Sequence, residues 1–269
     1  MSIIRADFEK MNVNKIRKAK GNKKLTVITA YDALFAKLFE EMADMILVGD
    51  SLNMSFAGKK DTLSATLEQM IYHTNAVCTG APKAFVILDM PFGSYINKDQ
   101  ALSNAVKVYQ ECPAAAIKIE GGEDRAYIIE HLCKNSIAVM AHIGLMPQYV
   151  RSEGGYKVRG KTQKDIDQLI KDALAVEKAG AFCIVIEGVL SEAAKKISQA
   201  VSIPTIGIGA GKDTDGQVLV WSDMMGFFED FKPKFVRHYL DGANLVKEAL
   251  NNFVNDVQNE SFPSKKEEY

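Results

Sequence analysis

QKDIDQLIKDALAVEKAGAFCIVIE, residues 163–187, changes from one hydrophobic pattern to another along its length. In residues 163–179 the apolar side chains recur at helical spacing, and Lys178-Ala179-Gly180-Ala181 is typical of a helix that ends at a glycine. The next residues, 182–186, are nearly all apolar, which is the mark of a strand buried on both faces. The stretch therefore predicts a helix that leads directly into a strand of a parallel sheet.

The same alternation continues along the chain in both directions. Apolar runs of strand length lie at 25–29, 45–48, 84–88, 116–119, 137–140, 182–186, 203–208 and, more weakly, 218–220. Helical patterns separate them at 33–42, 66–79, 98–110, 124–134, 163–179 and 191–200. Strands that alternate with helices in this way favour a closed (β/α)8 TIM barrel. An open doubly wound sheet stays as the alternative, because sequence alone does not show that a sheet closes.

We expect helices before and after the barrel. The region before Leu25 predicts an extra N-terminal helix that caps the barrel bottom, and residues 232–257 predict a C-terminal helical extension. Residues 259–269 are polar, and we expect this tail to fray. Since no linker or composition shift interrupts the sequence, we expect residues 1–269 to form a single catalytic domain.

The amino-acid composition excludes several classes of protein. Lys and Arg total 33 against 34 Asp and Glu, a net charge of −1, which argues against nucleic-acid binding and against a polybasic membrane-surface protein. No apolar run approaches the ~18 residues of a membrane span, and the N-terminus lacks the apolar core of a signal peptide. The cysteines Cys78, Cys112, Cys133 and Cys183 form no CxxC pair, as expected for reduced thiols. These features predict a cytoplasmic protein.

Acidic residues follow four of the predicted strands. They are Asp50, Asp89, Glu120 and Glu187. One such acid is usually a helix cap, but the carboxyl ends of parallel strands meet at one rim of a barrel, where barrel enzymes have their active sites. Carboxylates gathered there repel one another unless a cation lies between them, and oxygen ligands without a Cys or His cluster suit Mg²⁺.

Three further residues belong to this rim. Lys118 lies two residues before Glu120, so both side chains point to the same side of their strand and we expect Lys118 to face the site. Ser51 follows Asp50 and serves either as a helix cap or as a contact to an anionic substrate group. His142 ends the fifth strand, a position where histidine is more often structural than a ligand.

Taken together, these motifs and others along the chain resemble the ketopantoate hydroxymethyltransferase family. The resemblance extends in order over about residues 10–245 and rests on TAYD (29–32), VGDSL (48–52), YHT (72–74), DMPF (89–92), IKIEGG (117–122), HIGLMPQ (142–148), GGYKVRG (154–160), IGIGAG (206–211) and PKFV (233–236). Departures from the family pattern are Asn53 in place of glycine, Ser64 in place of proline and Met146 in place of threonine. None of them touches an acid, so they bear on loop closure over the site and not on the activity.

The resemblance implies a reaction and a role for each residue. A hydroxymethyl group would pass from the co-substrate 5,10-methylenetetrahydrofolate to 3-methyl-2-oxobutanoate, giving 2-dehydropantoate for pantothenate synthesis. Asp50 and Asp89 would hold one Mg²⁺ per subunit, with Glu120 completing its shell directly or through water. Asp50 and Asp89 would also contact the substrate. Ser51 and Lys118 would bind the substrate carboxylate, and Glu187 would accept the proton. The family also implies a cytoplasmic homodecamer built from two pentamers.

Two rival functions remain. One is another metal-dependent C–C lyase or mutase of the phosphoenolpyruvate/pyruvate barrel type, which carries a cysteine in its catalytic loop, whereas the loop at 144–162 here has none. The other is a non-catalytic ligand-binding barrel, which would lack at least one of Asp50, Asp89 and Glu187; all three are present.

Overall fold

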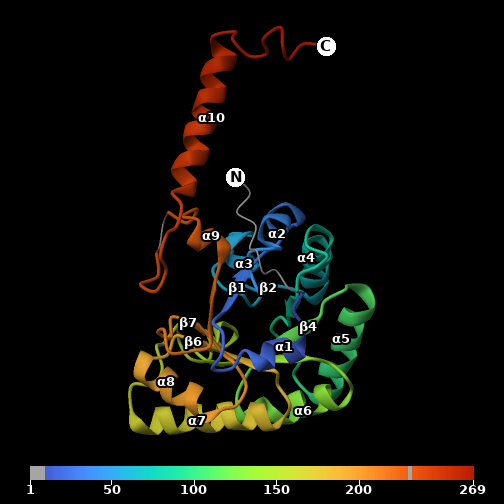
Figure 1. Cartoon of the computed structure of the whole chain (residues 1–269), viewed down its shortest axis with the longest axis vertical. Helices are drawn as coiled ribbons and strands as arrows, with labels where there is room; N and C mark the ends of the chain where they lie inside the picture. Colours follow the sequence, from blue (N-terminus) through green and yellow to red (C-terminus); the bar gives the residue numbers. More distant parts are fainter. Residues whose placement is uncertain (1–9, 230–231) are drawn as a thin grey trace. The chain divides into compact units, whose positions relative to one another are not determined.

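The computed structural model describes residues 10–229 and 232–269. Its eight strands form one closed parallel barrel (Figure 1). The strands are β1 (Leu25–Thr29), β2 (Met45–Val48), β3 (Val86–Asp89), β4 (Ala116–Glu120), β5 (Val139–Gly144), β6 (Cys183–Glu187), β7 (Thr205–Ile208) and β8 (Gly216–Leu219). Each strand pairs with the next, and β8 pairs with β1 from Leu25↔Gly216 to Ile28↔Leu219. The predicted TIM barrel is confirmed, and the open-sheet alternative is wrong.

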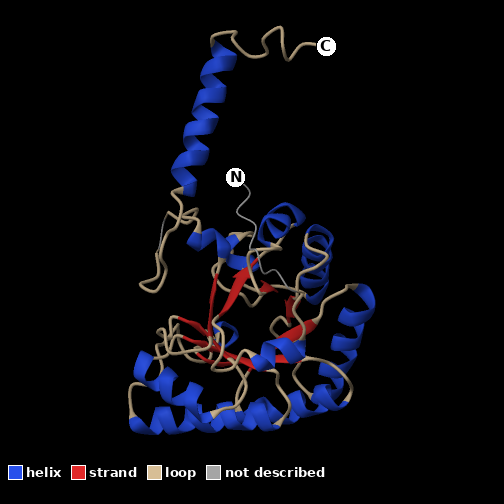
Figure 2. Ribbon diagram, viewed as in Figure 1, coloured by secondary structure: helices blue, strands red, loops and turns tan. Residues whose placement is uncertain are grey.

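Helices surround the strands, as Figure 2 shows by colour. They are α2 (Ala33–Phe39), α3 (Leu52–Ser55), α4 (Leu67–Gly80), α5 (Lys98–Glu111), α6 (Ala126–Lys134), α7 (Gln163–Lys178) and α8 (Ser191–Ala200), with short 3₁₀ turns η1 (Glu123–Arg125) and η2 (Pro147–Tyr149). Side-chain caps fix several N-termini: Thr66 and Gln69 form a reciprocal capping box before α4, and Thr162 accepts a hydrogen bond from the backbone N–H of Asp165 before α7.

Several predicted strands have different bounds in the structure. The seventh begins at Thr205 and not at Ile203, because Pro204 has no N–H to donate to the ladder. The fifth begins at Val139, because Ile137 still belongs to the turn out of α6, where its N–H bonds to the carbonyl of Leu132 and Ser136 takes a positive φ of 67°. Strand β8 begins at Gly216, two residues before the apolar run that marked it.

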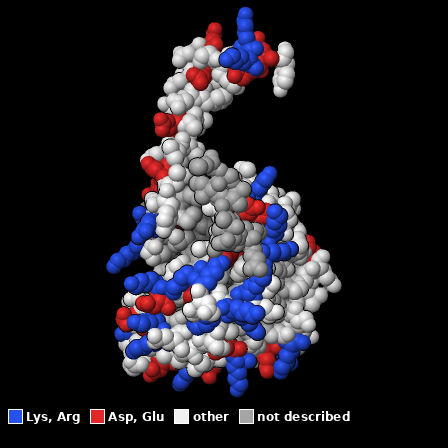
Figure 3. Space-filling view, viewed as in Figure 1, with Lys and Arg blue, Asp and Glu red and all other residues white. Residues whose placement is uncertain are grey.

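The N-terminal helix α1 (Val13–Lys18) closes the amino end of the barrel. Its Ile16 is fully buried and packs in one core cluster with residues at the starts of the strands, among them Leu25, Met45, Phe85 and Phe182. The predicted cap at the barrel bottom is confirmed. Figure 3 shows Lys and Arg side chains gathered on this face of the molecule. Lys23, in the segment after α1, forms an ion pair with Asp44 at 2.6 Å.

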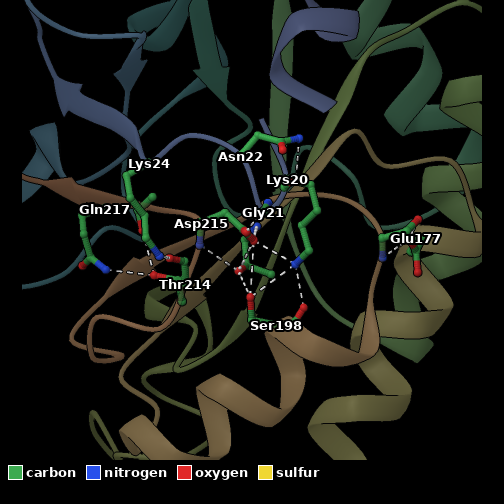
Figure 4. A network of polar contacts seen from close by, with 12 residues as sticks. Lys20, Gly21, Asn22, Lys24, Glu177, Ser198, Thr214, Asp215 and Gln217 are labelled. Atoms are coloured by element: carbon green, nitrogen blue, oxygen red, sulfur yellow. Dashed lines mark hydrogen bonds and ion pairs between the residues drawn. The ribbon is translucent and has the colours of Figure 1, made fainter. Parts of the chain in front are cut away.

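A buried polar network anchors the segment after α1 to the barrel bottom (Figure 4). Asp215, just before β8, accepts hydrogen bonds from Lys20 Nζ at 2.8 Å, from the Gly21 N–H at 3.2 Å and from the Thr205 N–H at 2.9 Å. The hydroxyl of Ser198 on α8 joins the same carboxylate at 3.3 Å. One carboxylate therefore ties three parts of the chain together at the end of the barrel opposite the acids.

Replacing Asp215 with Asn should lower the free energy of unfolding by about 2 kcal/mol near neutral pH, because buried donors lose a charged acceptor. Burial raises the pKa of Asp215, but the hydrogen bonds from Lys20, Thr205 and Gly21 outweigh it and lower the pKa overall. A carboxylate of this kind stabilises the fold above its unfolded pKa of about 3.9, and that contribution is lost as the pH falls through the folded pKa. Urea unfolding should therefore show the gap between wild type and variant closing in acid; a gap that is the same at every pH would contradict this role.

Residues Trp221–Tyr269 form a compact unit separate from the one that ends at Val220. It contains α9 (Trp221–Met224) and α10 (Gly242–Gln258). The expectation of helix from residue 232 is wrong for 232–241, because the backbone there makes turn contacts, such as Tyr239 N–H to the carbonyl of Met224. Residues 259–269 are exposed, and their fraying stays a prediction, as does the single domain over residues 1–269. No helix within 10–229 and 232–269 has the length and apolar character to cross a membrane.

Candidate active site

The four strand-end acids lie at one end of the barrel. Asp89, Glu120 and Glu187 are the last residues of β3, β4 and β6, and Asp50 lies two residues after β2. Because all strands run parallel, this is the carboxyl-terminal rim. Asp50, Asp89 and Glu120 are buried, whereas the side chain of Glu187 is 22% exposed. The sequence therefore placed these acids at the correct rim, and Glu187 is the acid that solvent or a substrate can reach.

Asp50 and Asp89 meet directly. The backbone N–H of Asp50 donates a hydrogen bond to Asp89 Oδ2 at 3.2 Å. Burial raises the pKa of Asp50 well above its ordinary value, and the nearby charges of Asp89 and Glu120 raise it further. Their negative charges therefore repel one another, and a cation placed between them would be stabilising.

Lys118 supplies part of that charge. Its Nζ lies 2.7 Å from Asp89 Oδ1, and the side chain is only 5% exposed. Burial lowers the pKa of this ammonium, but Asp89, Glu120 and Asp50 outweigh burial and raise it, so Lys118 is charged. The residue faces the acids, as its position two residues before Glu120 predicted.

His142 lies between two of the acids. Its Nδ1 is 3.5 Å from Glu120 Oε1, and its Nε2 is 3.3 Å from Glu187 Oε2. Burial and Lys118 lower the pKa of His142, but the contacts with Glu120 and Glu187 outweigh them and raise it to about 9. The ring therefore connects the buried acids to Glu187, a bridging position that the sequence did not reveal.

Gly144 allows the backbones of the two strands that carry His142 and Glu187 to lie in close contact. Gly144 has φ +100°, and a Cβ there would lie 2.4 Å from the Glu187 carbonyl oxygen. The next residue, Leu145, donates its N–H to that same carbonyl at 2.8 Å. Only a residue without a side chain permits this close contact.

The Ser51 side chain contacts another side chain and does not cap a helix. It makes no side-chain cap at α3, and its Oγ lies 2.9 Å from the Tyr31 hydroxyl. The helix-cap reading of Ser51 is therefore wrong, and its hydroxyl belongs to a polar pair beside Asp50.

Sequence reasoning missed two residues that hold the acids in place, Gln148 and Tyr95. Gln148 Nε2 donates to Asp50 Oδ2 at 2.9 Å, and its backbone N–H donates to Glu120 Oε2 at 3.1 Å. The Tyr95 hydroxyl donates to Gln148 Oε1 at 2.5 Å and accepts the Glu120 N–H at 3.2 Å. Tyr95 lies in a loop and Gln148 in the short 3₁₀ turn η2, so no hydrophobic period marked them.

Comparison with known proteins decides what kind of site this is. The family model described as ketopantoate hydroxymethyltransferase matches residues 10–265. The chain belongs to this family. The 3-methyl-2-oxobutanoate hydroxymethyltransferase of Aliarcobacter butzleri is 78% identical over the full length of both chains, and that of Helicobacter pylori is 52% identical over the full length of both. The chain is accordingly a hydroxymethyltransferase, and the resemblance seen in the sequence is confirmed.

Solved structures of other enzymes share the barrel. Phosphoenolpyruvate phosphomutase from Streptomyces platensis subsp. rosaceus has a TM-score of 0.63 at 14% identity, covering 91% of this chain and 88% of that one. Phosphonopyruvate hydrolase in complex with oxalate and Mg²⁺ has a TM-score of 0.61 at 15% identity, covering 96% and 93%. At such identities the likeness is one of fold alone, and it lends no support to the rival lyase function.

The rim of this hydroxymethyltransferase has the donor set for a hard cation. Asp89 Oδ1 and Glu120 Oε1 are buried, and their nearest polar neighbours among the described residues are basic: Lys118 Nζ at 2.7 Å and His142 Nδ1 at 3.5 Å. Within 10–229 and 232–269, no group of three or more His, Cys, Asp or Glu side chains is placed so that together they could hold a metal ion. Mg²⁺ commonly takes one or two carboxylates and fills its shell with water and substrate oxygens, so the arrangement fits that ion.

Replacing Gln148 with Leu should weaken Mg²⁺ binding and lower the free energy of unfolding by roughly 1–3 kcal/mol, because buried Asp50 and Tyr95 lose their partner. Calorimetric titration of Mg²⁺ and urea unfolding would measure the two effects. Gln110→Leu, an exposed position on α5, is the matched control and should change neither. Unchanged Mg²⁺ affinity in the Gln148 variant would show that Asp50 does not need this partner.

Proposed function

We propose that this protein transfers a hydroxymethyl group from 5,10-methylenetetrahydrofolate to 3-methyl-2-oxobutanoate and so makes 2-dehydropantoate for pantothenate synthesis. The observation that carries the proposal is the partly exposed Glu187 beside a buried cluster of three acids and Lys118, in a chain of this family. A 2-oxo acid needs a cation for its two oxygens and a base for its C3 hydrogen. The rim offers residues for both needs.

The reaction balances with one water molecule. The C3–H bond of the oxo acid breaks, and C3 forms a bond to the methylene carbon of the carrier. Both C–N bonds that hold this carbon in the carrier break, water supplies the hydroxyl oxygen, and the carrier nitrogens each end with a hydrogen. Tetrahydrofolate and 2-dehydropantoate are the products.

Two acids are the proposed Mg²⁺ ligands. Asp50 and Asp89 would hold one ion per subunit, with Glu120 completing the shell directly or through water. A bound Mg²⁺ would supply Lewis-acid chemistry, polarising the keto group and acidifying the neighbouring C–H bond. The burial of three carboxylates together beside the ammonium of Lys118 supports this assignment.

The remaining residues bind the substrate and move its proton. Lys118 and Ser51 would bind the substrate carboxylate, and the Lys118 ammonium would stabilise negative charge that develops on the keto oxygen. Glu187 would take the C3 proton, since it is the exposed acid and is assigned no metal. His142, 3.3 Å from Glu187 Oε2, would hold that carboxylate in position.

The proposal extends to assembly and location. One side of α10 is apolar and exposed, with Val246, Leu250, Phe253 and Val257 at helical spacing, which supports association between copies of the chain. The family resemblance suggests ten subunits in two pentamers. Unpaired cysteines, which include the buried Cys78, Cys112 and Cys183, support a cytoplasmic location.

Product formation tests the proposed function. The purified enzyme with 3-methyl-2-oxobutanoate and methylenetetrahydrofolate should form 2-dehydropantoate, should stop after EDTA and should recover on addition of Mg²⁺. No product in the metal-loaded enzyme, or unchanged turnover in EDTA, would contradict the reaction or the metal respectively.

A further inference from the structure

A cavity of about 410 Å³ opens beside the acids. It is lined by residues from three loops at the carboxyl rim: Leu63, Ser64, Phe92, Gln148, Arg151 and Ser152. Gln148, the buried member of this lining, holds Asp50 Oδ2 at 2.9 Å. The cavity is therefore next to the proposed metal site, and its volume lies in the range of small-molecule sites, roughly 300–1,000 Å³.

Hydrogen bonds fasten the walls of this cavity. Asn53, buried on α3, donates through Nδ2 to the Asp61 carbonyl at 2.7 Å and to Ser64 Oγ at 3.0 Å. Asp61 in turn pairs with Arg151 at 3.3 Å. The loop that carries Leu63 and Ser64 is thus tied to α3 on one side and to the loop after β5 on the other, so the cavity is formed before any ligand arrives.

Its lining suits a ligand that is flat, apolar and negatively charged at one end. Phe92 is 55% exposed and lines the cavity, so its ring is open to stacking with a flat ligand. The Arg151 side chain is 77% exposed, and within the described residues its guanidinium has Asp61 as its single ion-pair partner. A guanidinium with donors to spare is suited to a carboxylate.

We propose that this cavity binds the aminobenzoyl-glutamate part of the one-carbon carrier, with the benzoyl ring against Phe92 and a glutamate carboxylate on Arg151. The assignment rests on the proposed function, which names a folate as the donor. It places the donor against Gln148, the residue that also contacts Asp50, so that the donor and the oxo acid bind at neighbouring positions of the rim.

Steady-state kinetics of two variants test the assignment. Phe92→Leu removes the ring and keeps an apolar side chain, and Arg151→Gln removes the charge. Each should raise the KM for methylenetetrahydrofolate about 3–10-fold, the scale of one exposed stacking or charged contact, with the KM for the oxo acid unchanged. Lys171→Gln, which removes an exposed charge from α7 outside the cavity, is the control and should change neither KM.

A second readout separates this assignment from the reaction itself. Exchange of the C3 hydrogen of 3-methyl-2-oxobutanoate in D₂O needs no donor, so both variants should exchange it at the wild-type rate, which also shows that they are folded. Normal exchange together with an unchanged KM for the donor would overturn the cavity assignment and leave the proposed function standing. A metal-loaded wild-type enzyme that neither exchanges nor forms product would overturn the proposed function and the cavity assignment with it.

Discussion

Replacing Glu187 with Gln should slow exchange of the C3 hydrogen of 3-methyl-2-oxobutanoate into D₂O by ~10²–10⁴-fold, the usual cost of removing a general base. Glutamine keeps the shape of the side chain but cannot accept the proton. Because Glu187 is assigned no metal, the variant should still bind Mg²⁺ and the oxo acid. NMR of the substrate in D₂O measures the exchange, and calorimetry measures the binding.

The matched control is Glu192→Gln on α8, an exposed glutamate in the first turn of a helix. If Glu187 were only a salt-bridging residue for His142, its replacement would cost stability and leave exchange nearly unchanged. Wild-type exchange in a folded, metal-loaded Glu187→Gln enzyme would move the base elsewhere, and His142, 3.3 Å from Glu187, would be the next residue to test.

Asp89→Asn should abolish turnover and weaken Mg²⁺ binding strongly while the barrel stays folded. The carboxylate lies 2.7 Å from Lys118 Nζ and accepts the Asp50 N–H, so its loss removes a metal ligand and leaves a buried ammonium without its nearest partner. Removing one partner of a buried pair costs roughly 3–5 kcal/mol of stability, offset here by less repulsion on Asp50. Circular dichroism checks the fold, and titration with Mg²⁺ together with the product assay checks the rest.

An exposed aspartate provides the comparison for this variant. Asp167→Asn on α7 changes the same charge outside the site and should leave metal affinity and turnover as they are. An Asp89→Asn enzyme that binds Mg²⁺ normally and turns over at the wild-type rate would show that the ion, if any, lies elsewhere.

The fold could be predicted from the sequence because a strand buried on both faces leaves a continuous apolar run, and each such run is bounded by helical spacing. Closure of the sheet could not, since it depends on the pairing of β1 with β8, whose first residues Gly216 and Gln217 are not apolar. Two apolar runs are longer than the strands they mark. Strand β7 begins only after Pro204, and Ile137 lies in the turn out of α6 and not in β5. In 232–241 a helical composition did not produce a helix.

Some residues of the site could likewise be predicted from the sequence, and others could not. Asp50, Asp89, Glu120 and Glu187 could be found because the end of a strand is visible in sequence and a barrel brings those ends to one rim. Gln148 and Tyr95 could not, because their role depends on one side-chain contact between loops 53 residues apart in the chain. The bridge that His142 forms between Glu120 and Glu187 likewise exists only after three strands are side by side.

We propose that this rim enolises a 2-oxo acid with the help of a divalent cation and independently of the carrier. Proton NMR of 3-methyl-2-oxobutanoate with the wild-type enzyme in D₂O, with no folate present, is the decisive measurement. We expect the C3 hydrogen signal to disappear with Mg²⁺, to persist in EDTA and to disappear again when Mg²⁺ is restored. A signal that persists in the folded, metal-loaded enzyme, or one that disappears equally fast in EDTA, would contradict it.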